Sequence, residues 1–327
     1  GGMILLHNEN ATPEMDVFAE QLAKQAYPEF PLVDLPPDHL LYSVVYPMKK
    51  KTPLKGVSNG HRLLMVYSPT DITKGWLIRQ GRGTNEQAQL GLNLFVYAAG
   101  KTNFHGRLIT PYIPPPLFAA LGSIPIARIK YTGGNWDPEP FAWQRFPRWF
   151  QEQTSIALSV TPQAIEELNF PAVPVAVLTG DSAVDFDKMN LQPLHDYVAA
   201  GGLVVIDSVA GNQPFIQSVR DKLLPKAFAD GQIQQLDTSH PLLAGTGDGM
   251  DPLPKAQLRQ FAIEQLGHNL PALDIVTLGK GAVIISDIDL TCGLLDTSTW
   301  GITGYEPNYC NSLVKNVILW ASERYHL

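Results

Sequence analysis

The chain has 327 residues, of which 45% are hydrophobic and 17% are charged, and it carries a net charge of −7. This composition is ordinary for a folded protein and excludes an intrinsically disordered chain. The lysines at 49–51 form its single basic run, and they are too few to make the concentrated basic face that nucleic-acid binding needs. No stretch of about 18 apolar residues is present, so we expect no membrane span in this chain.

The first hundred residues alternate between strand and helix patterns. A short apolar run follows two glycines at residues 3–6, and helical spacing follows over residues 15–26. A second apolar run covers residues 62–68, and a second helical pattern covers residues 92–98. Short apolar strands of this kind suit a sheet that is buried on both faces. We therefore predict a partial α/β half-domain over residues 1–108.

A Pro-rich segment at residues 109–123 separates this region from the rest, and we predict an extended linker there. A longer alternation follows over residues 124–327. The predicted strands cover residues 124–131, 155–160, 173–181, 203–206 and 281–286. The predicted helices cover residues 139–152, 189–200, 214–228 and 315–321. Alternating strands and helices predict a complete α/β domain with a doubly wound, parallel sheet.

The first region repeats the back half of the second. Each region has a Gly-Gly pair before a strand, a histidine further on (His39 and His240), and an asparagine in the last helix (Asn93 and Asn316). Each also contains the pattern S-x-x-D-[IL]-T-x-G, at residues 68–75 and 286–293. The same features in the same order predict an internal repeat. The second copy carries additional residues at 245–272, which we interpret as an inserted loop or helix.

Ligands of open parallel sheets bind outside the carboxyl ends of the strands. The residues that follow the predicted strands therefore define a candidate rim. We predict ligand contacts from nine of them: Gly133, Gly134, Trp136, Asp137, Thr179, Gly180, Asp181, Asp207 and Asp289.

Three interpretations of the rim compete. The first is hydrolysis, with Ser208 as nucleophile, His240 as base, and Asp287 or Asp289 as its orienting carboxylate. The flanking residues do not form the usual G-x-S-x-G turn. The second is a Mg²⁺ or Ca²⁺ site, which would use the four rim aspartates Asp181, Asp207, Asp287 and Asp289. The third is structural, because Asp and Ser at strand ends commonly cap the next helix.

The duplicated features favour the structural interpretation, so function is sought in what only the second copy has. Those features are the Gly-Gly-Asn-Trp loop at 133–136, Thr179-Gly180-Asp181 and Asp207-Ser208. No cofactor motif is present, and we predict none. The two cysteines, Cys292 and Cys310, do not have a zinc-site spacing. They leave the cellular compartment open.

Several motifs of the second copy resemble a bacterial family known as domain of unknown function 4159. They lie at residues 128–136, 178–180, 197–202, 239–241 and 286–293. The resemblance implies a three-layer α/β fold of the flavodoxin-like type, similar to class I glutamine amidotransferases. Those enzymes carry a cysteine at the turn where this chain has Asp207-Ser208, and a His-x-Glu that this chain lacks. Glutaminase activity is therefore disfavoured.

Members of the family are often attached to export signals or membrane segments, which favours the cell envelope or periplasm over the cytoplasm. The leading hypothesis is a non-glutaminase module that binds a small molecule or a protein partner at the rim. The alternative is a hydrolase that uses Ser208 and His240, or a metal held by the rim aspartates. The missing front half of the first copy would leave apolar strand edges, which the second domain or a dimer partner must cover.

Overall fold

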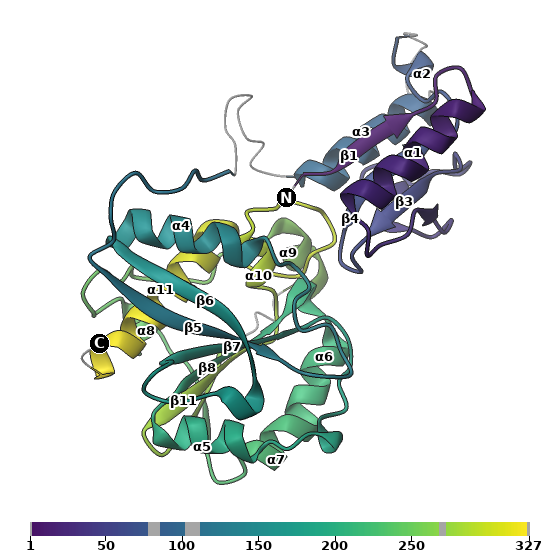
Figure 1. The fold of residues 1–327 in the computed structure, drawn as a ribbon. Helices are drawn as coiled ribbons and strands as arrows, with labels where there is room; N and C mark the ends of the chain where they lie inside the picture. The colour runs from purple at the N-terminus through teal and green to yellow at the C-terminus, as the bar shows by residue number, and fades with distance from the viewer. Residues whose placement is uncertain (1, 78–85, 102–111, 268–272, 326–327) are drawn as a thin grey trace. The chain divides into compact units, whose positions relative to one another are not determined.

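The structure is a computed structural model that describes residues 2–77, 86–101, 112–267 and 273–325 (Figure 1). It divides into two compact units, each with its own β-sheet. Unit 1 comprises Gly1–Ile109 and Thr297–Ile302, and unit 2 comprises Thr110–Asp296 and Thr303–Leu327. The sequence did not indicate that a short segment near the C-terminus belongs with the first unit. Part of the predicted linker, residues 109–111, lies outside the described residues.

Unit 1 contains a mixed four-stranded sheet in the order β1-β4-β3-β2. β1 and β4 are parallel, whereas β3 is antiparallel to both of its neighbours. Helix α1 packs one face through Ala19 and Ala23, which lie against Met65 and Tyr67 of β4. The strands are β1 (Ile4–His7), β2 (Val33–Asp34), β3 (Lys55–Ser58) and β4 (Leu63–Ser68). The helices are α1 (Pro13–Ala26), η1 (Leu40–Tyr42), α2 (Lys74–Leu77) and α3 (Glu86–Ala99).

Unit 2 contains a seven-stranded sheet in the order β6-β5-β7-β8-β11-β10-β9. The first five strands in this order are parallel, and β10 is antiparallel to both β11 and β9. The sequence predicted a parallel sheet, and the β10–β9 edge corrects this prediction. The strands are β5 (Gly122–Lys130), β6 (Ile156–Ala164), β7 (Val175–Gly180), β8 (Leu203–Ser208), β9 (Gln232–Gln235), β10 (Asp274–Leu278) and β11 (Gly281–Ser286).

Helices cover both faces of this sheet. α4 and α11 share one hydrophobic core with the sheet, and α5 to α7 share the other. The helices are α4 (Ala142–Thr154), α5 (Gln192–Ala200), α6 (Gln213–Ser218), α7 (Leu224–Ala227), α8 (Pro241–Ala244), α9 (Gln260–Leu266), α10 (Thr291–Leu294) and α11 (Pro307–Tyr325). Single turns are η2 (Ile165–Glu167), η3 (Phe186–Lys188), η4 (Val209–Gly211) and the π-turn η5 (Val219–Leu223). The predicted insertion at 245–272 contains α9.

The two sheets share an arrangement of four strands. The order β1-β4-β3-β2 of unit 1 has the same strand directions as β8-β11-β10-β9 of unit 2. The register agrees as well, because His7 lies opposite Ser68 and Asp207 lies opposite Ser286. Strands β5, β6 and β7 and helices α4 and α5, over residues 122–200, have no counterpart in the described part of unit 1. We call residues 122–200 the front half of unit 2.

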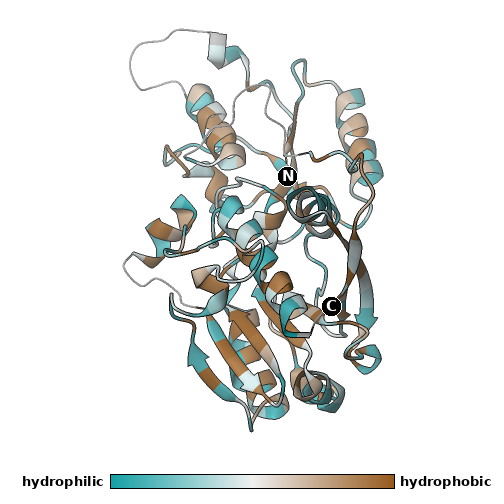
Figure 2. Cartoon of the chain, turned by 90° about the vertical axis from the view of Figure 1, so that its left-hand side faces the viewer, coloured by the Kyte–Doolittle hydropathy of each residue, from teal (hydrophilic) through white to brown (hydrophobic). Residues whose placement is uncertain are grey.

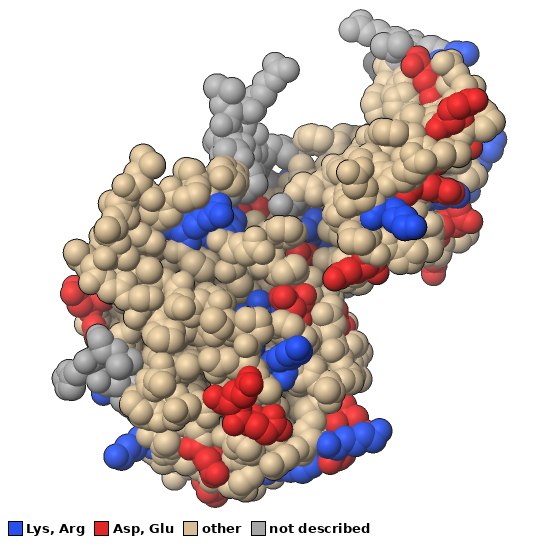
Figure 3. All heavy atoms as spheres, viewed as in Figure 1, with Lys and Arg blue, Asp and Glu red and all other residues tan. Residues whose placement is uncertain are grey.

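Hydrophobic side chains concentrate in the strands of the large sheet, which are mostly brown in Figure 2. On the face shown in Figure 3, Lys and Arg lie interspersed with Asp and Glu. Among the helices that the structure describes, none combines the length and hydrophobicity needed to cross a bilayer.

Candidate functional site

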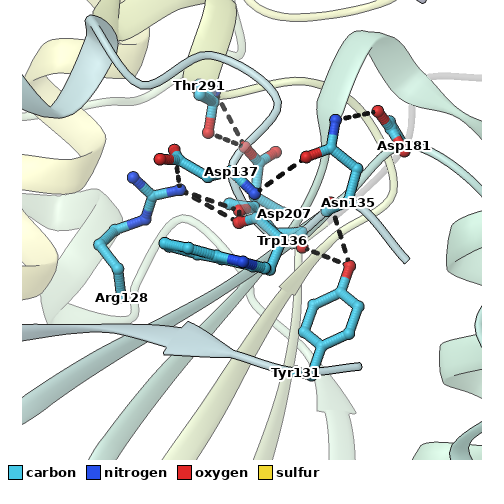
Figure 4. A network of polar contacts seen from close by, with 9 residues as sticks. Arg128, Tyr131, Asn135, Trp136, Asp137, Asp181, Asp207 and Thr291 are labelled. Atoms are coloured by element: carbon cyan, nitrogen blue, oxygen red, sulfur yellow. Dashed lines mark hydrogen bonds and ion pairs between the residues drawn. The ribbon is translucent and has the colours of Figure 1, made fainter. Parts of the chain in front are cut away.

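The candidate site lies where β5, β7, β8 and β11 end, because these four parallel strands bring their carboxyl ends to one edge of the sheet (Figure 4). The loop after β5, residues 131–137, covers part of this edge, and we call it the rim loop. Its Gly133 has φ +80°, a conformation that glycine adopts at little cost. Asn135 is exposed, and Trp136 and Asp137 are half-buried.

A buried ion pair lies beneath the rim loop. The Arg128 side chain is only 4% exposed, and its Nη2 lies 2.9 Å from Asp137 Oδ1. The same nitrogen donates to the Trp136 carbonyl at 3.2 Å. Burial lowers the pKa of Arg128, and the neighbouring Asp137 carboxylate opposes this shift. A guanidinium buried this deeply needs a carboxylate to compensate its charge, so Asp137 stabilises the folded state.

Further side chains hold the rim loop to β7. Thr179 Oγ1 donates to the Trp136 carbonyl at 2.7 Å. The Tyr131 hydroxyl lies 2.8 Å from the Thr179 carbonyl and 3.2 Å from the Asn135 carbonyl. Asn135 Nδ2 donates to Asp181 Oδ2 at 2.7 Å. The rim loop is therefore fixed from below while its outer surface stays open.

Two glycines of the predicted site are needed for packing. A Cβ at Gly180 would lie 2.2 Å from the Phe215 ring and 2.7 Å from the Tyr131 hydroxyl. A Cβ at Gly134 would lie 2.9 Å from the Tyr131 ring. Seven of the nine predicted ligand residues thus gather around the rim loop and the end of β7. They are Gly133, Gly134, Trp136, Asp137, Thr179, Gly180 and Asp181.

Asp207 ends β8 as a fully buried carboxylate. Its oxygens accept hydrogen bonds from the backbone of Leu290 and Thr291, both at 2.9 Å, and from Thr291 Oγ1 at 2.5 Å. Burial and the nearby Asp289 carboxylate raise the pKa of Asp207 to about 7. A small cavity of about 10 Å³ lies beside it, which is room for one water molecule at most.

Asp289 is also buried, in the turn after β11. Its Oδ1 accepts from the backbone of Ala210 at 2.9 Å and of Cys292 at 3.1 Å. Its Oδ2 is buried and has no hydrogen-bond partner among the residues that the structure describes. Asp207 and Asp289 therefore hold turns at the strand ends. Neither side chain reaches the outer surface of the rim.

The structure does not bring Ser208, His240 and Asp287 together. Ser208 Oγ donates to the Asn212 carbonyl at 2.8 Å, and His240 Nδ1 accepts from the Leu242 backbone at 3.4 Å. Asp287 lies 2.6 Å from Arg220. Ser208 ends β8 and His240 follows β9, with β11 and β10 between them. Three strand spacings correspond to about 14 Å, well beyond hydrogen-bond reach.

The backbone at Ser208 also differs from a nucleophile turn. Ser208 has φ −85°, an extended conformation, and the left-handed residue is Ala210 with φ 57°. A nucleophile elbow needs its strained turn at the nucleophile itself. Ser208 is therefore held as a buried hydroxyl rather than presented to a substrate.

A family model described as Domain of unknown function (DUF4159) matches residues 1–99 and 125–321. The chain belongs to this family. No curated protein matches it. The matched residues include the rim loop and both S-x-x-D turns.

The four aspartates considered as metal ligands in this DUF4159 chain have separate partners. Asp181 binds Asn135, Asp287 binds Arg220, and only Asp207 and Asp289 are neighbours. Within the described ranges, no three His, Cys, Asp or Glu side chains are grouped to hold a metal ion. Cys292 and Cys310 are free and buried, and burial raises the pKa of both thiols.

Arg128 and Tyr131 support the rim loop, and neither was predicted as a ligand residue from sequence; Asn135 belongs to the Gly-Gly-Asn-Trp loop that was predicted to carry function. Arg128 carried a usable signal, because it is the one charge within the apolar run Ile126-Ala127-Arg128-Ile129. A charge at such a position needs a buried partner. Tyr131 had no such signal, since polar residues are ordinary at a strand end.

Proposed function

We propose that unit 2 is a non-catalytic binding module of the cell envelope, with a three-layer fold similar to class I glutamine amidotransferases and flavodoxins. Five adjacent parallel strands with helices on both faces support this likeness. Ligand binding at the carboxyl ends of the strands would follow the general rule for such sheets.

The observation that carries the proposal is the fixed rim loop. Its backbone is held by Arg128, Tyr131 and Thr179 from below, while Asn135 is exposed. A loop that is ordered before binding loses little conformational entropy when a ligand arrives. Rigid support of an exposed loop is what a recognition surface needs.

The chemistry of the outer surface favours a polar ligand. Asp181 and Asn135 offer acceptor oxygens on one side of the rim loop, whereas the half-buried ring of Trp136 lies toward Arg128 (Figure 4). A carboxylate and an amide on a fixed loop suit a ligand that carries amine, amide or hydroxyl donors. An amino compound, a sugar or a short peptide segment would meet these requirements.

The competing proposal is hydrolysis by Ser208 with His240, or by a metal held by rim aspartates. It requires these groups to move together from positions in which each has another hydrogen-bond partner. The binding proposal needs no such rearrangement, and we therefore favour it.

We also infer that the two units share a duplicated half. Three pairs of side chains at equivalent positions make the same contacts. The Asn93 side chain accepts a hydrogen bond from the Tyr46 N–H and donates one to the Tyr46 carbonyl. Asn316 makes the same two hydrogen bonds with the backbone of Asp251. Ser68 and Ser286 each donate to the carbonyl two residues on. His39 and His240 each cap the following turn.

The binding proposal can be tested with ligand-observed NMR on the full chain, using a library of amino acids, amines, sugars and short peptides. We expect hits whose binding is at least tenfold weaker in Asp181→Ala and Trp136→Ala. Ser208→Ala and His240→Ala serve as controls and should bind normally. Hits that are cleaved, or that lose binding in the Ser208 and His240 variants alone, would support the hydrolase.

A further inference from the structure

A cavity of about 390 Å³ lies beside helix α5 in the front half of unit 2. Small-molecule sites in proteins have volumes of about 300–1,000 Å³. The lining residues come from the segments 168–170 and 190–200, and none belongs to the rim loop or to residues 179–181. We propose that this cavity is a second binding site, and that it holds a neutral, hydroxyl-bearing ring of the carbohydrate class.

The deeper part of the cavity is aromatic, and its mouth is polar. Tyr197 is 3% exposed and Phe170 is half-buried, and both line the cavity. Apart from Ala200, the exposed lining residues are all polar, namely Asn169, Asn190, Gln192 and Asp196. Aromatic side chains below a small number of polar groups are the usual composition of a small-molecule site.

Two glycines allow the chain to pack directly against the aromatic floor. A Cβ at Gly201 would lie 2.8 Å from the Phe170 ring, and a Cβ at Gly202 would lie closer still to the Tyr197 ring. The Tyr197 hydroxyl also donates to the Val173 carbonyl at 3.0 Å. Both rings are therefore supported by backbone and ordered before a ligand arrives. A floor of this kind loses little conformational entropy on binding.

One carboxylate at the mouth of the cavity is held in a fixed orientation. Asp196 Oδ1 accepts a hydrogen bond from Gln192 Nε2 at 2.8 Å and lies 3.0 Å from His195 Nδ1. The hydrogen bond with His195 lowers the pKa of Asp196, and the one from Gln192 adds to this shift. Asp196 is therefore an ionised hydrogen-bond acceptor at neutral pH.

The charges around the mouth favour a neutral ligand. Among the described residues that line the cavity, Asp196 is the only one that carries a charge. The hydrogen bond with Asp196 raises the pKa of the neighbouring His195, which extends the pH range in which this ring is a cation. The imidazolium then offsets the charge of Asp196, and the remaining polar groups at the mouth are side-chain amides.

A sugar ring matches this combination of groups. Each hydroxyl both donates and accepts, so neighbouring hydroxyls can satisfy a carboxylate and side-chain amides together. The C–H face of the ring is apolar and can pack on Phe170 and Tyr197. A purely apolar ligand would desolvate Asp196 without giving it a partner. A simple amine would leave the aromatic floor uncovered. The inference does not depend on the ligand of the rim.

The test maps amide chemical shifts of the full chain with glucose, N-acetylglucosamine and maltose at millimolar concentrations. We expect the largest shifts at residues 168–170 and 190–200. Nuclear Overhauser contacts should join the C–H protons of the sugar to the rings of Phe170 and Tyr197, because the proposed site stacks the sugar on this floor.

Two variants address the cavity in different ways. Asp196→Ala removes the carboxylate, and Ala200→Phe fills the cavity without removing a polar group. Each should weaken sugar binding at least tenfold. Glu166→Ala is the matched control, because Glu166 is an exposed carboxylate of η2 that does not line the cavity.

Three results would overturn the proposal. The first is the absence of shifts at 168–170 and 190–200 with all three sugars. The second is undiminished sugar binding in either Asp196→Ala or Ala200→Phe. The third is a set of shifts from ethylamine as large as those from the sugars at the same residues, which would make the cavity a cation site. Asp181→Ala at the rim should leave sugar binding here unchanged, so the two proposals fail separately.

Discussion

Asp207 and Asp289 place two buried carboxyl groups side by side at the ends of β8 and β11. Asp207 accepts three hydrogen bonds, whereas Asp289 accepts two, both through its Oδ1. In unit 1 the equivalent positions hold His7 and Asp71, whose side chains lie 3.8 Å apart. A histidine and a carboxylate attract each other when the ring is protonated, whereas two carboxylates repel. The S-x-x-D turn of unit 1 therefore sets Asp71 beside a histidine, and that of unit 2 sets Asp289 beside a carboxylate.

The pair makes stability depend on pH. The pKa of Asp207 is raised to about 7, above the value of about 3.9 for an unfolded chain. The folded state therefore binds this proton more tightly. Its contribution to the free energy of unfolding is present at low pH and falls as the pH rises from about 4 to about 7. Urea unfolding at pH 4.5, 6 and 8 measures this loss.

Asp289→Asn isolates the effect. The amide keeps the Oδ1 acceptor for Ala210 and Cys292 and removes the charge that repels Asp207. As the pH rises from 4.5 to 8, the free energy of unfolding should fall less in the variant than in the wild type. The difference between the two proteins should grow by on the order of 1–3 kcal/mol over this range. Parallel stability curves for the two proteins would show that the carboxylates do not interact.

Removing the partner of Arg128 should be costly. Asp137→Ala leaves a buried guanidinium without its carboxylate, and we expect a loss of about 3–5 kcal/mol in the free energy of unfolding. Exchange of the amides at 133–137 should accelerate as well. Asp181→Ala is the control, since this half-buried carboxylate should contribute no more than about 1 kcal/mol. Equal losses in the two variants would contradict the assigned role of Arg128.

Two glycines of the rim should respond to alanine for different reasons. Gly180→Ala forces a Cβ into the Phe215 ring and should destabilise the protein by about 1–3 kcal/mol or more. Gly133→Ala meets open space, but its φ of +80° disfavours alanine, so about 1 kcal/mol is expected. Thermal unfolding measures both. A larger loss at Gly133 than at Gly180 would be inconsistent with the described packing.

The matched asparagines test the shared half. Asn93→Ala and Asn316→Ala each remove hydrogen bonds to otherwise buried backbone, which should cost about 3 kcal/mol in each case. Each variant should accelerate amide exchange within its own unit. If one asparagine proved dispensable, the two would not hold equivalent turns.

Much of the fold could be predicted from sequence, because apolar runs and helical spacing record burial directly. The predicted strand at 203–206 lies within β8, and the helix at 189–200 contains α5. Strands β2, β3, β9 and β10 were not predicted; they are two to five residues long, and β2 and β9 are exposed, so that no buried apolar run marks those two. The candidate site was predicted as a set of strand ends, and seven of its residues do gather. Which of these side chains are buried supports and which lie on the exposed loop could not be predicted, because the sequence does not show how deeply each one is buried at the strand ends.

The hydrogen-bond partners of the polar side chains could not be predicted from the sequence either. Ser208 and His240 have the chemistry of a catalytic pair, and only the strand order places three spacings between them. Asp207 and Asp289 were included among the ligand residues because they follow strands. Their hydrogen bonds to backbone at 210 and 290–292 show that a strand-end aspartate can be entirely occupied by its own turn.

The most direct test of the rim proposal is residue-resolved amide chemical-shift mapping of the full chain with a hit from the ligand library. We expect the largest shifts at residues 132–137 and 181–183, their disappearance in Asp181→Ala, and recovery of the ligand unchanged. Shifts centred on Ser208 and His240, or turnover of the ligand that Ser208→Ala abolishes, would contradict it.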